Sequence, residues 1–398
     1  IELNPYIKNL ARHIGTASRE YSKQLHKVFA GNERNFEDSK FDFSLEHSGH
    51  FKSADIKLQF GAEGKNILQI KTSNGDNRLN ATLTIDKSDS DILHNVHVSL
   101  IERMLNDSLR EAIFSTLIPK PFLASAERTG AAIFQKELDF TKNRLVELLG
   151  DRSSKLHPIQ FLKKFGGEYP IGVRRNVDFI RDLSNITNRK SIILKKNPHL
   201  LESFKDIIGG EYTITRNDEI QYIPTTNKRV KLSMVESSSA VRSLLDIGFY
   251  LRNIADSGDL LMIDEPELNL HPENQRRVAR LFSRLVNLGI KVFVTTHSDY
   301  IIKELNTLIM LNQENKRLEA IAEREGYCKK DLLNSQKVKV YIAEDAAIKI
   351  DGAKRKRRYL TLVPAQIDSK TGIKAKSFDK TIDEMNRIQD EIVWGGDD

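Results

Sequence analysis

Cysteine and long apolar runs are almost absent from this chain. Cys328 is the only cysteine in 398 residues, which excludes an internal disulfide framework and a metal site built from cysteines. Such scarcity is typical of a reducing compartment, so we expect a cytoplasmic protein. No stretch approaches the roughly 18 consecutive apolar residues of a transmembrane helix, and no signal-peptide pattern follows Ile1. We therefore expect no membrane partner.

The chain also lacks a large excess of charge of either sign. The chain carries 62 Lys and Arg against 55 Asp and Glu, which gives a net charge of +7. A composition of 39% apolar and 29% charged residues is typical of a globular protein. Part of the positive excess is one basic run, Lys354–Arg358. Clustered cations bind nucleic-acid phosphates or acidic proteins, but an exposed, solvated loop explains the run equally well.

The first half of the chain divides into two predicted segments. In residues 1–135 we expect a lobe built from two helices, a strand meander and a short strand. These elements are expected over 6–30, 92–115, 53–87 and 121–126. Residues 136–208 are charged and have helical spacing, and they are expected to form a helical insertion or arm.

The second half of the chain has a different pattern, in residues 209–312 above all. The elements expected there are a hairpin over 212–224, a helix over 241–254, and two apolar strands over 260–263 and 291–295 around a helix over 272–288. Nearly continuous apolar strands that alternate with helices indicate a parallel sheet covered on both faces. We therefore predict an α/β fold with a mixed or parallel sheet flanked by helices. Residues 313–398 are expected to form an α/β extension for partner or oligomer contacts.

Two adjacent carboxylates end the first apolar strand. Asp264 and Glu265 follow Leu260–Ile263 directly, and Pro266 turns the chain out of the strand. The carboxyl edge of a doubly wound sheet is where phosphate ligands bind. There, Asp264 is suited to hold Mg²⁺ and Glu265 to act as general base toward water. The alternative is a strand that ends in a solvated acidic turn.

A histidine occupies the equivalent position after the second apolar strand. His297 follows the strand that ends at Thr295, and parallel strands end at the same edge of a sheet. An imidazole there is within reach of a terminal phosphate or an attacking water. A lone histidine is more often structural, but this placement favours a catalytic role for His297.

The order of these motifs resembles the ATP-hydrolysis core of ABC-type ATPases. Ile263–Pro266 resembles a Walker B strand with its catalytic glutamate, Asn269–His271 resembles the D-loop, and His297 resembles the switch histidine. Upstream, Ser237–Leu244 resembles the signature motif in the form found in SMC-like and OLD-like "AAA" ATPases. Ala240 stands where glycine is commoner in that motif. The resemblance covers residues 209–311 well and residues 1–208 only in outline.

The resemblance implies an ABC ATPase head that binds ATP and Mg²⁺ between two subunits. Ser237, Ser238, Ser239 and Arg242 would then contact the nucleotide of the opposite subunit, although a serine cluster is also a common helix N-cap. Asn269 would belong to the same nucleotide site. Arg128 resembles an arginine-bearing strand end of these ATPases and is expected near the nucleotide, with a structural salt bridge as the alternative.

The Gly-rich phosphate loop of such ATPases does not occur in this sequence. Gly61–Asn66 is the nearest imitation, but it is too short and lacks the hydroxyl residue that binds Mg²⁺. Since the sequence starts at Ile1 and not at a methionine, we expect the loop upstream. A degenerate relative that does not hydrolyse ATP is the alternative.

The resemblance extends to ATPase subunits of bacterial antiphage systems of the Septu, PARIS and AbiL-like groups. It implies a self-associating sensor, triggered by a phage protein, that controls a separate nuclease or toxin. Two alternatives are an SMC-like DNA-repair clamp and a scaffold that binds ATP without turnover. The final helix, expected over 378–393, either docks a partner through Trp394 or caps the core.

Overall fold

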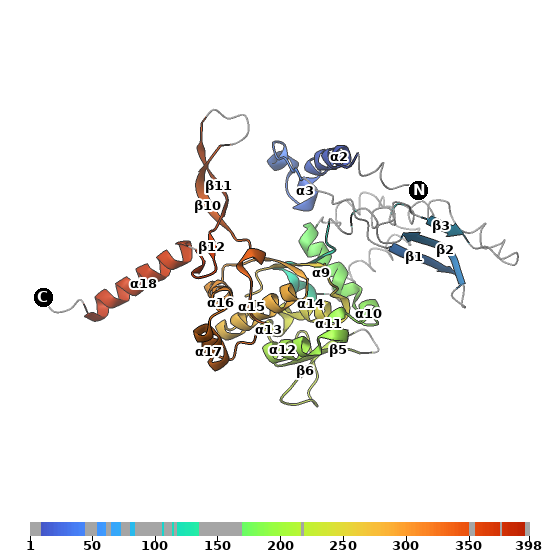
Figure 1. Cartoon of the computed structure of the whole chain (residues 1–398). Coiled ribbons are helices and arrows are strands. Elements are labelled where there is room, and N and C mark those ends of the chain that lie inside the picture. Colours follow the sequence, from blue (N-terminus) through green and yellow to red (C-terminus); the bar gives the residue numbers. More distant parts are fainter. Residues whose placement is uncertain are drawn as a thin grey trace, which may run out of the picture. The chain divides into compact units, whose positions relative to one another are not determined.

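The computed structural model divides the chain into two compact units (Figure 1). The first comprises residues 1–121 and 153–174, and the second comprises residues 122–152 and 175–398. The structure describes residues 9–43, 54–60, 65–72, 80–83, 106, 114, 118–134, 169–215, 219–349, 355–374 and 376–394. In these ranges no helix combines the length and the apolar character that a membrane crossing needs.

The first unit contains short helices and a three-stranded meander. The helix expected over 6–30 forms α2 (Leu10–Ser22) and α3 (Leu25–Val28), and the 3-10 turn η1 (Glu33–Phe36) follows. The strands β1 (Ala54–Phe60), β2 (Lys65–Thr72) and β3 (Asn80–Leu83) are antiparallel neighbours in that order. The predicted meander is therefore confirmed. The helix predicted over 92–115 lies outside the described residues, apart from Asn106 and Phe114.

The sheet that carries the predicted motifs lies in the second unit. Its strand order is β4 (Pro121–Ala124), β8 (Leu260–Asp264) and β9 (Lys291–Thr295), and β8 and β9 run parallel. The α/β class with a parallel strand pair and flanking helices is confirmed. The expectation that β9 is buried on both faces is wrong, because its residues alternate between half-buried and exposed and Phe293 is 53% exposed. Apolar content alone did not distinguish a strand with one open face from a fully covered one.

Three short helical elements contribute buried side chains to the core. The helix expected over 241–254 is divided into α13 (Ser239–Ser243), α14 (Leu245–Phe249) and the π-helical turn η3 (Tyr250–Ile254). Leu245, Tyr250 and Leu251 are fully buried in these elements. The Phe122 ring of β4 lies against Tyr250, with 4.6 Å between ring centroids. This aromatic contact connects β4 to η3.

The described part of the helical segment before this core consists of short helices, and its assignment as an insertion or arm stays a prediction. Its elements are α9 (Ile171–Arg181), α10 (Leu183–Ile186), α11 (Ile192–Lys196) and α12 (Pro198–Ile208), and all four carry buried apolar residues. Ile193 is fully buried and Ile180 nearly so. The helical prediction is thus confirmed for 171–208, while the predicted helix between 136 and 168 lies outside the described residues.

A small antiparallel sheet supports the serine-bearing helix. It consists of β5 (Gly210–Ile214), β6 (Ile220–Pro224) and β7 (Leu232–Ser233), which confirms the predicted hairpin. A side chain at Gly210 would meet the Ile223 carbonyl oxygen at 2.4 Å, so only glycine fits there. The buried Tyr212 hydroxyl donates a hydrogen bond of 2.5 Å to the Val241 carbonyl in α13. The sheet therefore fixes one side of that helix.

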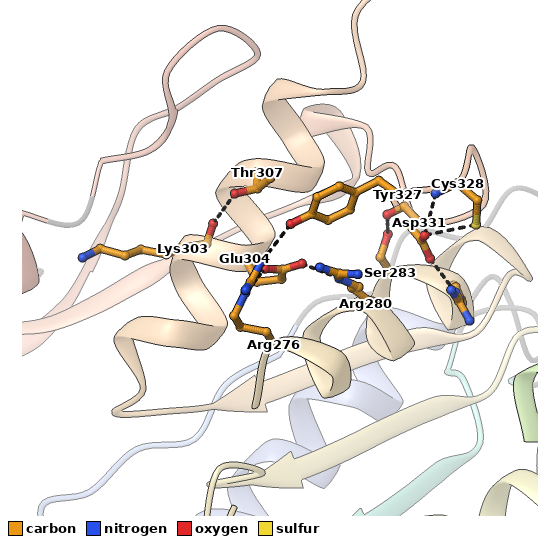
Figure 2. A network of polar contacts seen from close by, with 10 residues as sticks. Arg276, Arg280, Ser283, Lys303, Glu304, Thr307, Tyr327, Cys328 and Asp331 are labelled. Atoms are coloured by element: carbon orange, nitrogen blue, oxygen red, sulfur yellow. Dashed lines mark hydrogen bonds and ion pairs between the residues drawn. The ribbon is translucent and has the colours of Figure 1, made fainter. Parts of the chain in front are cut away.

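Buried carboxylates connect the helices that follow β8 and β9. The helices α15 (Pro272–Asn287) and α16 (Asp299–Met310) lie side by side (Figure 1). Glu304 of α16 is 1% exposed and accepts hydrogen bonds from Arg276 (2.6 Å) and Arg280 (2.5 Å) of α15 (Figure 2). Beyond α17 (Lys316–Arg324), Asp331 accepts from Arg284 at 2.5 Å. Burial raises the pKa of Asp331, but hydrogen bonds from Arg284 and Cys328 hold it below its usual value.

The C-terminal extension attaches to α16 and then forms a hairpin and a helix. Asn306 accepts from the Ile373 backbone N–H at 2.7 Å, which ties β13 (Gly372–Ile373) to α16, and β13 pairs with β12 (Ile367–Asp368). The other elements are η4 (Ser335–Lys337), β10 (Tyr341–Ile348), β11 (Arg357–Pro364) and α18 (Lys376–Trp394). The strands β10 and β11 are antiparallel partners, and the described part of the basic run lies at the start of β11.

Candidate functional site

The register of the parallel strands places Asp264 opposite Thr295 at the same sheet edge. The Thr295 hydroxyl donates a short hydrogen bond to the Asp264 carboxylate. The Thr295 carbonyl accepts from the Glu265 backbone N–H at 3.0 Å. Both the side chain and the next peptide of the predicted metal ligand are therefore held by the neighbouring strand.

The two predicted catalytic side chains lie next to each other at this edge. Glu265 adopts a left-handed backbone conformation with φ of +47°, which is rare for a residue other than glycine. The distance from Glu265 Oε1 to His297 Nε2 is 3.9 Å. Glu265 is 34% exposed and His297 is 88% exposed at the side chain. Both groups are thus open to a ligand, and they attract each other when the imidazole is protonated.

Glu267 fixes the loop that carries His297, a role that the sequence reasoning missed. Its carboxylate accepts from the Thr296 hydroxyl at 2.8 Å and from the His297 backbone N–H at 2.6 Å. Charge-assisted bonds of this kind are stronger than neutral ones. A third acidic residue directly after Pro266 was the available signal, but its partners lie about 30 positions away in the sequence.

Arg128 lies beneath the carboxylates and is 1% exposed. Its guanidinium donates to the main-chain carbonyls of Asp264 at 2.6 Å and Glu265 at 2.9 Å. It also donates to the carbonyls of Ser243 at 2.6 Å and Ser125 at 2.9 Å. Burial lowers its pKa, and the negative charge of Asp246 is the largest effect that opposes this. In the structure Arg128 supports the site from inside, and a contact with nucleotide stays a prediction.

The serine cluster lies at the start of α13. Ser238 is exposed and caps the helix, since its hydroxyl accepts from the Val241 N–H at 3.3 Å. Ser237 is buried and donates to the Ser233 carbonyl at 2.8 Å. Arg242 turns back over this loop and donates to the Ser237 carbonyl and, at 3.2 Å, to the Met234 carbonyl. The predicted N-cap is therefore present, and of Ser237 and Ser238 only Ser238 is exposed.

The turn between β8 and α15 presents Asn269 to solvent. Asn269 is exposed and has a left-handed φ of +62°. Its neighbour His271 caps α15 by accepting from the Glu273 N–H at 3.3 Å. Gln275 of the same helix accepts from the Ser298 hydroxyl at 2.5 Å. The turn and the His297 loop are thus joined through α15.

The donor groups at this edge fit a magnesium ion held by few protein ligands. Magnesium keeps several waters and commonly uses one or two carboxylates. Asp264 supplies one carboxylate at the edge, and the Thr295 hydroxyl orients it. The described residues contain no cluster of three or more His, Cys, Asp or Glu side chains, as a site ligated entirely by protein would need. The assignment of Asp264 as the magnesium ligand stays a prediction.

Comparisons with known proteins place this geometry in context. A mitochondrial amino-acid acetyltransferase of Scheffersomyces stipitis is 23% identical over 205 residues, which are 50% of this chain and 29% of that protein. The chain thus spans less than a third of the length of this curated relative.

Two solved structures of SMC proteins show only a low likeness to this chain. One comes from structural work on the ATP-driven dimerization and DNA-stimulated activation of SMC ATPases. It is 14% identical with a TM-score of 0.26, and the match covers 52% of this chain and 96% of that chain. The other is an SMC head bound to the C-terminal winged-helix domain of ScpA, at 14% identity and a TM-score of 0.25, with 60% and 61% covered. Such low scores assign no function.

The family assignment depends instead on a match along most of the sequence. The model of the AAA ATPase domain matches residues 3–302 of the 398. The matched region includes Asp264, Glu265 and His297 at the common edge of β8 and β9. The chain belongs to the AAA ATPase domain family.

Proposed function

We propose that this protein hydrolyses ATP at the carboxyl edge of β8 and β9. The observation that carries the proposal is the 3.9 Å approach of Glu265 and His297 beside the oriented carboxylate of Asp264. These are the residue types that phosphoryl transfer to water requires: a base, a polar group near the terminal phosphate and a metal ligand. Membership of an ATPase family supports the same reaction.

The roles of the three residues follow from their chemistry. The Glu265 carboxylate accepts the proton of the attacking water, and His297 orients that water or the terminal phosphate. Asp264 would hold Mg²⁺, which when bound supplies positive charge to the phosphate oxygens. Glu267 keeps His297 in place through the loop backbone.

Replacement of Glu265 by glutamine tests this assignment in the full-length protein. Glutamine keeps the shape but cannot accept the proton, so we expect turnover to fall about 100-fold or more while ATP affinity is retained. Glu273→Gln on the exposed start of α15 is the matched control. Unchanged hydrolysis in the Glu265 variant would show that the base is elsewhere.

We further propose that ATP joins two copies of the chain, with Ser238 of one copy at the nucleotide of the other. Ser238 supports this because it is the exposed hydroxyl at the start of α13. In the Glu265→Gln background, ATP should produce a stable dimer or larger oligomer in light-scattering measurements. Adding Ser238→Arg, which fills the contact with a bulky cation, should restore the monomer, whereas Ser257→Arg on an exposed turn should not.

For the biological role, we propose a sensor in bacterial antiviral defence that controls a separate effector. The support is the resemblance of the motif set to antiphage ATPases, together with the family assignment. A phage protein would be the trigger, and a nuclease or toxin the effector. Cells that carry the gene with its neighbours should survive phage challenge, and Glu265→Gln should alter that survival. Equal survival with and without the gene would overturn the role.

A DNA clamp is the second candidate, and one observation favours it. Arg355, Lys356 and Arg357 are all exposed at the end of the β10–β11 hairpin. Cations that contact phosphates make affinity fall steeply with salt concentration. Binding to duplex DNA that weakens with salt, and that is lost when these three residues become glutamine, would favour the clamp over the sensor.

A further inference from the structure

The buried guanidinium of Arg128 joins three segments that are distant in the sequence. Its four hydrogen bonds reach the loop after β4, the end of α13 and the end of β8. The acceptors in α13 and β8 lie 115 to 137 positions further along the chain. All four acceptors are main-chain carbonyls. The planar guanidinium has five N–H donors and serves all four acceptors, whereas a lysine ammonium has three donors and cannot serve all four.

The cation is held there without a hydrogen-bonded carboxylate among the described residues. Asp246 is the acid whose charge acts on it most strongly. Asp246 is itself 1% exposed, and neither of its carboxyl oxygens has a hydrogen-bond partner in the described part of the chain. Burying the charge of Arg128 costs free energy. The structural effect of the buried guanidinium is to fix the positions of the two carbonyls at the end of β8.

Those carbonyls belong to the predicted metal ligand and the predicted base. By fixing the Asp264 and Glu265 carbonyls, Arg128 fixes the peptides from which both side chains project. Glu265 has the left-handed φ of +47°, which surrounding contacts must maintain. The third acceptor is the carbonyl of Ser243, which is the last residue of α13, the helix that begins after Ser238. A shift of α13 therefore moves the same guanidinium that holds the Glu265 turn.

We propose that Arg128 is a positioning residue that couples α13, and with it Ser238, to the catalytic turn at Glu265. This inference rests on the proposed function of Glu265. When a nucleotide engages Ser238, the displacement of α13 reaches the base through one side chain. Arg128 acts through main-chain carbonyls and does not itself touch the nucleotide.

The test compares Arg128→Lys and Arg128→Met with Arg276→Lys as control, all in the full-length protein. Lysine keeps the charge but serves fewer carbonyls, so we expect kcat to fall about tenfold or more, and further in the methionine variant. KM for ATP and the Kd of a fluorescent ATP analogue should stay within about threefold of wild type. Thermal unfolding, followed by circular dichroism, provides the folded fraction by which kcat is corrected.

Three outcomes would overturn the inference. A rise in KM and Kd with kcat unchanged would make Arg128 a nucleotide ligand. A lowered unfolding midpoint with unchanged kcat per folded molecule would make its role purely structural. Additive losses in the Arg128→Lys, Glu265→Gln double variant would show that the two residues act independently. If Glu265→Gln alone leaves turnover intact, the proposed function has failed, and that result is distinguishable from the first three.

Discussion

Thr295 and Asp264 occupy opposite positions on two parallel strands, and the threonine hydroxyl donates to the aspartate carboxylate. A backbone hydrogen bond from Glu265 to the Thr295 carbonyl reinforces the pair at 3.0 Å. One residue of β9 therefore orients the Asp264 carboxylate and holds the backbone of Glu265. A threonine at the end of an apolar strand has no obvious function in the sequence, yet here it orients the carboxylate of the predicted metal ligand.

Thr295→Val should raise the magnesium concentration needed for half-maximal ATP hydrolysis. Valine preserves the shape and the β-propensity but removes the hydroxyl, so Asp264 loses the bond that orients it. We expect a shift of about threefold to tenfold in a magnesium titration at saturating ATP. Thr295→Ser keeps the hydroxyl and should remain close to wild type. An identical titration for the valine variant would contradict the role of this hydrogen bond.

Glu267→Gln should lower kcat while ATP binding persists. One amide oxygen replaces two carboxylate oxygens, so either the Thr296 hydroxyl or the His297 N–H loses its acceptor and faces an NH₂ group. The loss of one charge-assisted bond corresponds to about tenfold or more in rate if His297 acts in the chemical step. Steady-state kinetics and nucleotide binding separate the two effects, and raised Kd with normal kcat would argue against this role.

Asp246→Asn should remove a pH dependence of stability. Burial raises the pKa of Asp246 from 3.8 to about 7, against the attraction of Arg128. Between these values the folded state binds more protons than the unfolded state, so the stability contributed by this group falls as pH rises from about 4 to about 7. The asparagine variant should therefore lose less stability than wild type across this window in urea unfolding. Exposed Asp178→Asn is the control, and parallel curves for wild type and Asp246→Asn would contradict the prediction.

Glu304→Gln should destabilise the second unit by about 2–4 kcal/mol. The substitution removes the buried charge that pairs with Arg276 and Arg280, while both arginines remain. The expected loss is placed below that of a fully buried pair, because these arginines are 46% and 24% exposed. Chemical denaturation measures the difference. Glu323→Gln on the exposed side of α17 should have little effect, and equal losses for the two variants would disprove the role of the pair.

The sequence predicted the sheet edge because its signals are local. The apolar strands that end at Asp264 and Thr295 define where the chain leaves the core, and parallel strands bring their ends together. The hairpin over 212–224 was predicted for the same reason. The position of Glu265 and His297 at one sheet edge follows from this topology, and the structure adds the 3.9 Å distance between their side chains.

Other features depended on contacts that no local pattern encodes. Three of the four hydrogen bonds of Arg128 end on main-chain carbonyls more than 100 positions away, and a carbonyl has no signature in the sequence. The open face of β9 was also missed, since Val292, Phe293 and Val294 look alike in a covered and an uncovered strand. The helix over 241–254 was predicted as one continuous element, and the structure divides it into α13, α14 and η3.

The left-handed turn at Glu265 lowers local backbone stability at the position of the proposed base. At φ of +47° the backbone favours glycine, which has no Cβ to strain. Retaining a carboxylate there costs about 1–2 kcal/mol of local conformational energy relative to glycine. Mutational drift toward glycine at this position would relax the backbone and abolish the base in one step. Inactive relatives of this protein are therefore expected to be those in which this turn has relaxed to glycine.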